Sequence, residues 1–269
     1  MELERKHVIL TGAGGGIGRC LTGQLAAQDC RLLLVDRELH GLETLRSELN
    51  RDDQDCRLLA ADITTAAGRQ EIISTATHHF EKIDLLINLA GTMHFGSFKA
   101  EDEHTTELLF AVNVLAPMQL SRAVLPLMPP GSRIVNIGSI FGSIAFAYFT
   151  SYSATKFALR GFSEALRREL TDSGIGVTYI APRATRTPFN NQAVYDMSDR
   201  VKMNFDSPEH VAAQIVSAIR ADAKEKYLGR PESLFVRLNS LLPRLVDRAL
   251  RKQNRMTRDF ALKTHSASE

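Results

Sequence analysis

The sequence Thr11-Gly12-Ala13-Gly14-Gly15-Gly16-Ile17-Gly18 follows an apolar run at 7–12 and leads into a segment, 17–28, with helical periodicity. Closely spaced glycines at such a junction let backbone N–H groups and the positive end of the helix dipole approach a pyrophosphate. Asp36 closes the next apolar run, eighteen residues beyond Gly18, where a carboxylate accepts hydrogen bonds from an adenosine ribose. The pattern predicts a dinucleotide site that includes Gly12, Gly14, Gly16, Ile17, Gly18 and Asp36.

Short apolar runs alternate with longer helical patterns along most of the chain. The runs are rich in Leu, Ile and Val and mostly lack alternating polar residues, as expected for parallel strands covered on both faces. Helical periodicity recurs between them, for example at 39–50, 101–127 and 151–171. This alternation indicates βαβ units with right-handed crossovers, and therefore an α/β doubly wound sheet. The expected strands lie at 7–12, 31–36, 56–62, 83–91, 133–139 and 176–182.

Composition excludes several classes of protein. Of 269 residues, 44% are hydrophobic and 24% charged, which excludes disordered and collagen-like chains. The net charge of +2 is too balanced for a dedicated nucleic-acid binder. Three cysteines without CxxC spacing favour a reducing compartment. No apolar run approaches the ~18 residues of a membrane span, and the charged start leaves no room for a signal peptide, so we expect a cytoplasmic protein.

The C-terminal part of the chain differs in charge from the rest. Residues 226–269 contain 10 basic and 4 acidic side chains, a net charge of +6, so the preceding residues carry −4. We therefore expect a catalytic domain over 1–230 and a basic amphipathic helical extension over 231–269.

Three side chains form a candidate catalytic group. Tyr152 and Lys156 lie four residues apart near the start of an expected helix and therefore share a face. A free tyrosine is a poor base at pH 7, but an ammonium beside it and a positively charged nicotinamide favour its phenolate. Ser139 ends the strand expected at 133–139, where its hydroxyl can hold a substrate oxygen.

Residues 5–229 resemble the short-chain dehydrogenase/reductase family. TGAGGGIG matches its TGxxxGxG loop, YSATK its YxxxK motif, and Asp62-Ile63 its adenine-contacting pair. The resemblance implies a Rossmann fold with a mostly seven-stranded parallel sheet, a catalytic role for Ser139, Tyr152 and Lys156, and a homodimer or homotetramer formed through 101–127 and 151–171. It also implies that Asn113 orients a water relay reaching the lysine. The cofactor contacts that it implies are Asp62, Ile63, Asn88, Ala90, Gly91, Tyr152, Lys156, Pro182 and Thr187.

Two positions depart from the family pattern. Leu89 replaces the second asparagine of the NNAG motif, and Arg183 replaces the glycine after Pro182. Leu89 removes one side chain that braces the sheet. Arg183 can rigidify its loop or contact a phosphate or acidic substrate, but we expect it to point to solvent.

The cofactor is expected to be NAD rather than NADP. The carboxylate of Asp36 repels a 2′-phosphate. NADP stays an alternative cofactor, because Arg37 directly follows Asp36 and its guanidinium can turn toward that phosphate.

Segments beyond the expected strand ends supply an apolar, aromatic set of side chains. They suggest a lipophilic alcohol or ketone, although these side chains also suit core or subunit contacts. His94 is the polar candidate and is expected to be solvated; the other histidines lack ligand spacing, so no metal site is predicted. The segments are 92–98, 140–149 and the substrate loop at 188–206.

The favoured function is an NAD(P)-dependent oxidoreductase that interconverts a secondary alcohol and a ketone. One alternative is the reductase of a 3-oxoacyl thioester. Another, from a different class, is a non-catalytic dinucleotide-binding sensor or scaffold, which would not need both Tyr152 and Lys156. No nucleic-acid partner is expected.

The C-terminal extension has an apolar face opposite a basic one. Pro243 should divide it into two short helices. The apolar face either packs on the domain or a second subunit, or contacts anionic lipid or an acidic carrier protein through 231–258. The face comprises Leu238, Leu241, Leu242, Leu245, Val246, Ala249 and Leu250, and the basic side comprises Arg237, Arg244, Arg248, Arg251 and Arg255.

Overall fold

A seven-stranded parallel sheet forms the centre of the protein. The computed structural model describes residues 1–266, and for 230–233 and 263–266 it describes the backbone only. The strands are β1 (His7–Thr11), β2 (Arg31–Asp36), β3 (Cys56–Ala60), β4 (Leu85–Asn88), β5 (Arg133–Ile137), β6 (Gly176–Ala181) and β7 (Glu225–Tyr227), in the order β3-β2-β1-β4-β5-β6-β7. The predicted doubly wound Rossmann fold is confirmed.

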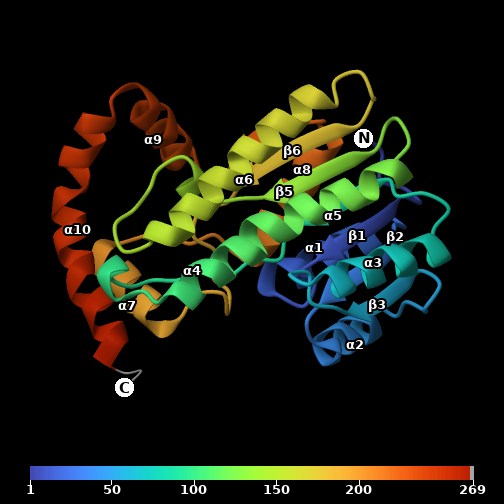
Figure 1. Cartoon of the computed structure of the whole chain (residues 1–269), viewed down its shortest axis with the longest axis horizontal. Helices are drawn as coiled ribbons and strands as arrows, with labels where there is room; N and C mark the ends of the chain where they lie inside the picture. The colour runs from blue at the N-terminus through green and yellow to red at the C-terminus, as the bar shows by residue number, and fades with distance from the viewer. Residues whose placement is uncertain (267–269) are drawn as a thin grey trace.

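Helices cover both faces of the sheet, as Figure 1 shows. One apolar core joins the sheet to α1 (Gly16–Ala26), α2 (Leu39–Glu48) and α8 (Pro208–Arg220). The other core joins it to α3 (Ala66–His79), α5 (Ala116–Val124) and α6 (Thr150–Glu169). Because both faces are covered, the strands are almost continuously apolar, as the sequence pattern predicts.

The long helical pattern at 101–127 contains an interruption. It forms α4 (Glu103–Phe110), a π-helical turn η2 (Ala111–Leu115), α5 and a 3₁₀ turn η3 (Leu125–Leu127). In the described part of the chain this stretch, Glu103–Leu127, alone is long and apolar enough to cross a membrane. The expectation that no such stretch exists is therefore wrong. Here the apolar residues of α5 are required for the core, since Ala116, Leu120 and Val124 are buried against the sheet.

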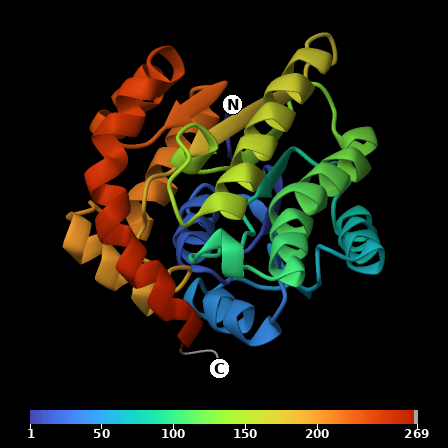
Figure 2. The same cartoon turned by 60° about the vertical axis from the view of Figure 1, so that its left-hand side comes forward.

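Short 3₁₀ turns and three helices complete the described elements. The turns are η1 (Phe98–Ala100) and η4 (Ile140–Gly142), and the helices are α7 (Gln192–Val201), α9 (Arg230–Leu241) and α10 (Pro243–Ser266). Pro243 begins α10, so the predicted division of the extension at Pro243 is confirmed. The expectation that both helices are short is wrong for α10, which has 24 residues. Residues 267–269 of the predicted extension lie outside the described residues. Figure 2 brings α9 and α10 forward, packed along one end of the fold.

The register aligns the carboxyl ends of the central strands. Thr11 at the end of β1 pairs with Val35 of β2 and Asn88 of β4. The loops that follow these strands therefore start side by side, which is where ligands bind in doubly wound sheets.

At the opposite side of the sheet, Asp84 connects the amino-terminal ends of β1 and β4. Its buried carboxylate accepts hydrogen bonds from the backbone N–H of His7 at 3.0 Å and from Lys6 Nζ at 3.2 Å, and Lys82 Nζ lies at 3.4 Å. Burial raises the pKa of Asp84, but these donors and charges outweigh it and hold that pKa below the ordinary value of 3.8. The charged carboxylate therefore stabilises the fold.

We predict that Asp84→Asn lowers the free energy of unfolding by about 1–3 kcal/mol at pH 7, because charge-assisted hydrogen bonds are lost. The contribution of a carboxylate with a lowered pKa is present above pH 3.8 and disappears as the pH falls through its folded value. Urea unfolding between pH 3 and 7 measures it. A difference between variant and parent that is independent of pH contradicts this assignment.

Candidate active site

The glycine loop forms a tight turn at the end of β1. Gly12 has a φ of +73° and lies so close to Ala90 that a Cβ atom would be 2.8 Å from the Ala90 nitrogen. At Gly18 a Cβ would lie 2.1 Å from the Gly12 carbonyl oxygen, so only glycine fits. Gly15 caps α1 without a side-chain hydrogen bond, and the first turn holds no acidic residue. The N–H groups of Gly16, Ile17 and Gly18, in the first turn of α1, have no hydrogen-bond partner among the described atoms, so they can donate to a dinucleotide phosphate, and the loop fits the predicted cofactor.

Two carboxylates follow the ends of β2 and β3. Asp36 accepts hydrogen bonds from the Gly14 N–H at 2.9 Å and the Arg37 N–H at 2.8 Å. Asp62 accepts from the backbone N–H and the hydroxyl of Thr64, and these bonds hold the pKa of Asp62 below its ordinary value. The exposed Arg37 adds a favourable charge to Asp62. Ile63 packs in the core between sheet and helices.

The segment after β4 is fixed from within the fold. Asn88 donates its amide N–H groups to Asn136 Oδ1 at 2.8 Å and to Ser121 Oγ at 3.3 Å, so this side chain braces β5 and α5. The N–H groups of Leu89 and Ala90 both donate to Thr11 Oγ1 at 3.3 Å. Leu89, where the family has asparagine, packs against the core cluster that contains α1. The departure at Leu89 therefore exchanges a polar brace for an apolar contact.

Tyr152 and Lys156 lie one turn apart at the start of α6, and both are buried, with 7% and 4% of their surface exposed. Lys156 Nζ lies 5.6 Å from the centre of the Tyr152 ring and donates to the Ile137 carbonyl oxygen at 3.4 Å. Burial lowers the pKa of Lys156 to about 8. Burial also raises the pKa of Tyr152 above its ordinary value, and a hydrogen bond with the Ser139 side chain opposes that rise.

Asn113 lies in the π-helical turn, a local widening of a helix that is frequent at functional sites. Its Oδ1 accepts from the Thr92 N–H at 2.9 Å, and its Nδ2 donates to the Thr92 carbonyl at 2.8 Å and to Thr155 Oγ1 at 3.1 Å. A Cβ placed on Gly91 would meet Asn113 Oδ1 at 3.2 Å and Lys156 Nζ at 3.8 Å. Gly91 thus leaves open the space on which both polar groups converge.

Tyr179 of β6 is a supporting residue that the sequence analysis missed. Its hydroxyl donates to the Ser139 carbonyl oxygen at 3.1 Å, and the Ser139 N–H donates to the Tyr179 hydroxyl oxygen at 3.4 Å. The side chain is fully buried, and a Cβ at Gly138 or Gly142 would lie within 2.4 Å of it. A tyrosine inside an apolar strand run was the available signal, because a buried hydroxyl needs a partner.

Arg183 lies inside the base of the substrate loop, so the expectation that it points to solvent is wrong. Its Nε and NH2 groups donate to the two carboxylate oxygens of Asp206 at 2.9 Å and 2.6 Å, and Asp206 is 9% exposed. A β-bridge between Thr185 and Asp206 runs alongside. Bidentate pairing in a buried place fixes geometry as well as charge. Arg183 therefore joins the two ends of the segment that contains α7.

The predicted cofactor residues that follow β6 lie against the glycine loop and η4. Thr187 is buried, and its side chain occupies the space where a Cβ on Gly16 would lie. The carbonyl oxygen of Pro182 accepts a hydrogen bond from the Ile140 N–H at 3.0 Å.

An apolar cluster surrounds the Tyr152 ring. Phe141 lies edge-on to Tyr152, with 5.7 Å between ring centres, and Phe189 lies at 6.3 Å. Ala261 and Phe260 bring α10 into this cluster, and α10 also packs on α7. A small pocket beside it is lined by Phe141, Phe146, Ala147, Phe149, Met197, Met203, Gln253, Asn254 and Thr257. The C-terminal extension therefore forms part of the wall beside Tyr152.

His94 differs from its expected solvated state. Its Nε2 is buried without a hydrogen-bond partner among the described atoms, and its ring lies against Gly96, where a Cβ would be 2.7 Å from that nitrogen.

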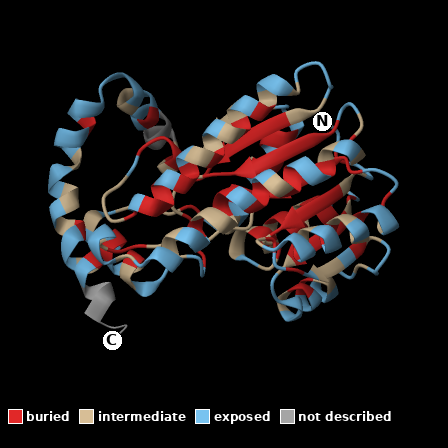
Figure 3. Ribbon diagram, viewed as in Figure 1, coloured by how far each residue is buried: buried red, intermediate tan, exposed pale blue. Residues whose placement is uncertain are grey.

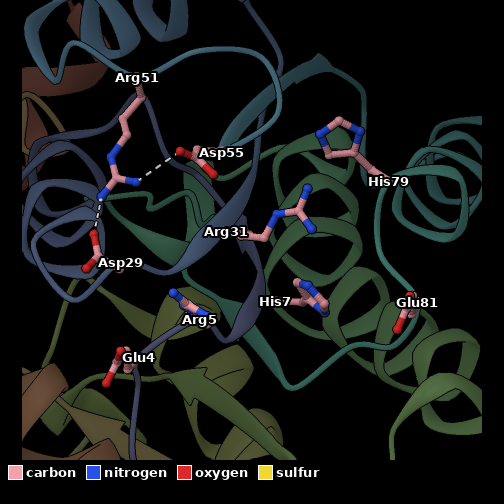
Figure 4. A pocket seen from close by; sticks show the side chains of 9 residues that line it. All are labelled: Glu4, Arg5, His7, Asp29, Arg31, Arg51, Asp55, His79 and Glu81. Atoms are coloured by element: carbon pink, nitrogen blue, oxygen red, sulfur yellow. Dashed lines mark hydrogen bonds and ion pairs between the residues drawn. The ribbon is translucent and has the colours of Figure 1, made fainter.

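A second, polar hollow lies at the other end of the strands (Figure 4). It is lined by Glu4, Arg5, His7, Asp29, Arg31, Arg51, Asp55, His79 and Glu81. Within it Arg51 pairs with Asp29 at 3.2 Å and with Asp55 at 3.4 Å. None of the predicted site residues lines this hollow, so it is not the candidate active site. Among the described residues no group of three or more His, Cys, Asp or Glu side chains is arranged to hold a metal ion.

The chain is similar to known proteins in sequence and in fold. A family model described as short chain dehydrogenase matches residues 6–198. An uncharacterised oxidoreductase of Bacillus subtilis, YxnA, is 28% identical over 261 residues, which are 93% of this chain and 73% of that protein. The 3-ketodihydrosphingosine reductase of Bos taurus is 31% identical over 228 residues, 80% of this chain and 69% of that protein. A Burkholderia phymatum short chain dehydrogenase/reductase solved in complex with NAD superimposes with a TM-score of 0.82 at 23% identity, covering 91% of this chain and 96% of that one.

We predict that Lys156→Met stabilises the free protein, because it removes a buried ammonium. The difference between the ordinary pKa of 10.5 and about 8 corresponds to roughly 3 kcal/mol as an upper bound at pH 7. Since the folded protein holds this proton less tightly than the unfolded chain, the gain is constant below pH 8 and disappears as the pH rises to 10.5.

Urea unfolding of the parent and Lys156→Met from pH 7 to 10.5 measures this gain. The exposed Lys224→Met serves as a control and should change stability by less than about 0.5 kcal/mol. A Lys156→Met protein that is less stable than the parent at pH 7 contradicts the prediction.

Proposed function

The chain belongs to the short-chain dehydrogenase family of oxidoreductases, and we propose that it interconverts a secondary alcohol and its ketone, with Tyr152 as the acid/base residue. The observation that carries the proposal is the burial of Tyr152 and Lys156 together at the carboxyl ends of the strands, beside the partly buried Ser139. Proton transfer requires an ionisable phenol with a positive charge beside it. A non-catalytic sensor or scaffold has no need for this buried pair.

In ketone reduction, the Tyr152 hydroxyl donates its proton to the carbonyl oxygen while the Ser139 hydroxyl holds that oxygen. The phenolate left behind is stabilised by Lys156, whose Nζ lies 5.6 Å from the ring centre. In alcohol oxidation the phenolate takes the hydroxyl proton. The bound dinucleotide supplies or accepts the hydride at its nicotinamide ring. Hydrogen bonds with Thr92 and Thr155 hold the Asn113 side chain next to Lys156 and Gly91, where it lines the space between them.

We propose that the dinucleotide rests on the glycine loop, with its adenosine ribose at Asp36 and its adenine near Asp62 and Ile63. Asn88, Ala90, Gly91, Pro182 and Thr187 would bound the rest of the cofactor. Lys156 Nζ has one weak hydrogen bond among the described atoms, so it retains donors for a ribose hydroxyl. Asp36 supports NAD over NADP, because its carboxylate is held at the loop by Gly14 and repels a 2′-phosphate.

The proposed substrate is a lipophilic ketone or alcohol. The side chains around the Tyr152 ring are mainly aromatic and aliphatic, and Gln253, Asn254 and Thr257 of α10 add polar groups to the neighbouring pocket. A substrate with a long apolar chain can pack against the aromatic side chains. A polar group on that substrate can form hydrogen bonds with Gln253, Asn254 and Thr257. The relative named 3-ketodihydrosphingosine reductase supports ketone reduction on such a chain. A 3-oxoacyl thioester remains the alternative substrate.

A homodimer through α4, α5 and α6 is part of the proposal. Leu108, Leu115, Met118 and Phe157 of this surface are exposed by 36–52%. Apolar side chains grouped in this way are typical of subunit contacts.

We predict that Tyr152→Phe lowers kcat by at least about 100-fold, because the proton donor is lost while the ring keeps its packing. Dinucleotide affinity should change by less than about threefold. Steady-state kinetics on a panel of lipophilic ketones, together with calorimetric titration of NAD, tests both effects. Full activity of the variant on any substrate of the parent contradicts the mechanism.

We predict that the parent uses NAD in preference to NADP. Asp36→Ala should lower the ratio of kcat/KM with NAD to kcat/KM with NADP by about tenfold or more, because the repulsion of the 2′-phosphate is lost. Glu38→Ala removes a nearby exposed charge that makes no contact with the loop among the described atoms, so it should have a smaller effect. A parent that prefers NADP contradicts this assignment and would show that Arg37 outweighs Asp36.

A further inference from the structure

The turn between α9 and α10 carries a group of exposed apolar side chains. Leu241, Leu242 and Leu245 are 78%, 52% and 52% exposed, and we refer to these three residues as the hairpin tip. Leu234 and Phe235, which lie earlier on α9, are also exposed, by 67% and 49%. Figure 3 shows the hairpin at one end of the molecule, largely exposed along its outer side. Large apolar side chains grouped this way mark an interaction surface.

The hairpin is held on the body, so the exposure of its tip does not arise from a detached helix. Val236 of α9 and Val246 of α10 are 5% and 3% exposed. Asn239 Nδ2 donates to the Ser143 carbonyl oxygen at 3.0 Å. Further along α10, Thr257 and Ala261 are buried on the substrate side. The predicted single apolar face is thus divided: Val246 is buried, whereas Leu241, Leu242 and Leu245 point outward.

Basic side chains surround this tip and continue along α10. Seven basic residues and one acidic residue, Asp247, fall between positions 237 and 258, and all eight are exposed. The seven are Arg237, Arg244, Arg248, Arg251, Lys252, Arg255 and Arg258. None of them forms an ion pair among the described side chains. The surface around the tip is therefore strongly positive.

We propose that the hairpin tip docks on a bilayer surface that contains anionic lipid, with the leucines entering the interface and the arginines contacting headgroups. A convex tip with a basic surround matches this partner in both hydrophobicity and charge. A second copy of the chain fits less well, because a two-fold contact at the tip places two positive surfaces together. An acidic protein would match the charge, but the tip offers a protruding turn rather than a groove.

If the proposed function holds, the position of α10 connects membrane docking with access to the substrate. The helix that starts at the tip runs past the proposed substrate pocket, to which its middle part contributes Gln253, Asn254 and Thr257. A lipophilic substrate partitions into the membrane, so an enzyme docked by its tip meets it at high local concentration.

Vesicle flotation of the full chain without substrate tests the docking independently of activity. We expect binding to phosphatidylcholine vesicles that contain about 30% phosphatidylglycerol at low salt, loss of that binding at high salt, and no binding to vesicles of phosphatidylcholine alone. Leu241→Ser with Leu242→Ser, and Arg244→Gln with Arg248→Gln, should each weaken binding by about tenfold or more.

Matched controls are Leu39→Ser and Arg122→Gln, which change exposed residues of α2 and α5 and should bind as the parent does. The tip variants should retain the parent's thermal unfolding and its kcat on a water-soluble ketone. Absence of flotation at low salt, or equal flotation of the tip variants and the parent, overturns the proposal. A tip variant that instead loses a self-association seen by light scattering also overturns it and assigns the tip to a subunit contact.

Discussion

The burial of two ionisable side chains, Tyr152 and Lys156, is the constraint on which the site depends. Removing both from water favours the neutral phenol and weakens the hold of the ammonium on its proton, as their opposite pKa shifts show. Each group becomes easier to charge when the other is charged, because their interaction is poorly screened inside the protein. Burial of the Lys156 ammonium destabilises the folded protein, but it places a positive charge beside the proton donor Tyr152. Stability and the proposed chemistry therefore oppose each other at one turn of α6.

Several surrounding contacts keep this pair in register with the strand ends. Tyr179 holds the backbone of Ser139 from behind, and the π-helical turn places Asn113 between Thr92 and Thr155. Arg183 and Asp206 close the base of the substrate loop. None of these groups transfers a proton in the proposed reaction. They fix the positions of groups that do, within the narrow tolerance that acid/base catalysis requires.

Local sequence patterns predicted the glycine turn, the helical pairing of Tyr152 with Lys156, and six strands, because each depends on residues close together in the chain. Strand β7 was missed since Glu225–Tyr227 is three residues long and has no apolar run. The Arg183 pair was missed because Asp206 lies 23 positions away and the sequence does not show which charges meet. The path of α10 over the pocket depends on contacts across the fold, so periodicity revealed its helix but not its location.

The measurement that tests this account most directly is the ionisation of Tyr152, followed as the ultraviolet difference absorbance between the parent and Tyr152→Phe during a pH titration. In the free protein, Tyr152 should ionise above the value of about 10 for free tyrosine. Saturation with NAD, which brings a positive nicotinamide to the site, should lower that midpoint by about two pH units or more. A Tyr152 that ionises at the ordinary value in the free protein, or whose midpoint does not move when NAD binds, contradicts the account.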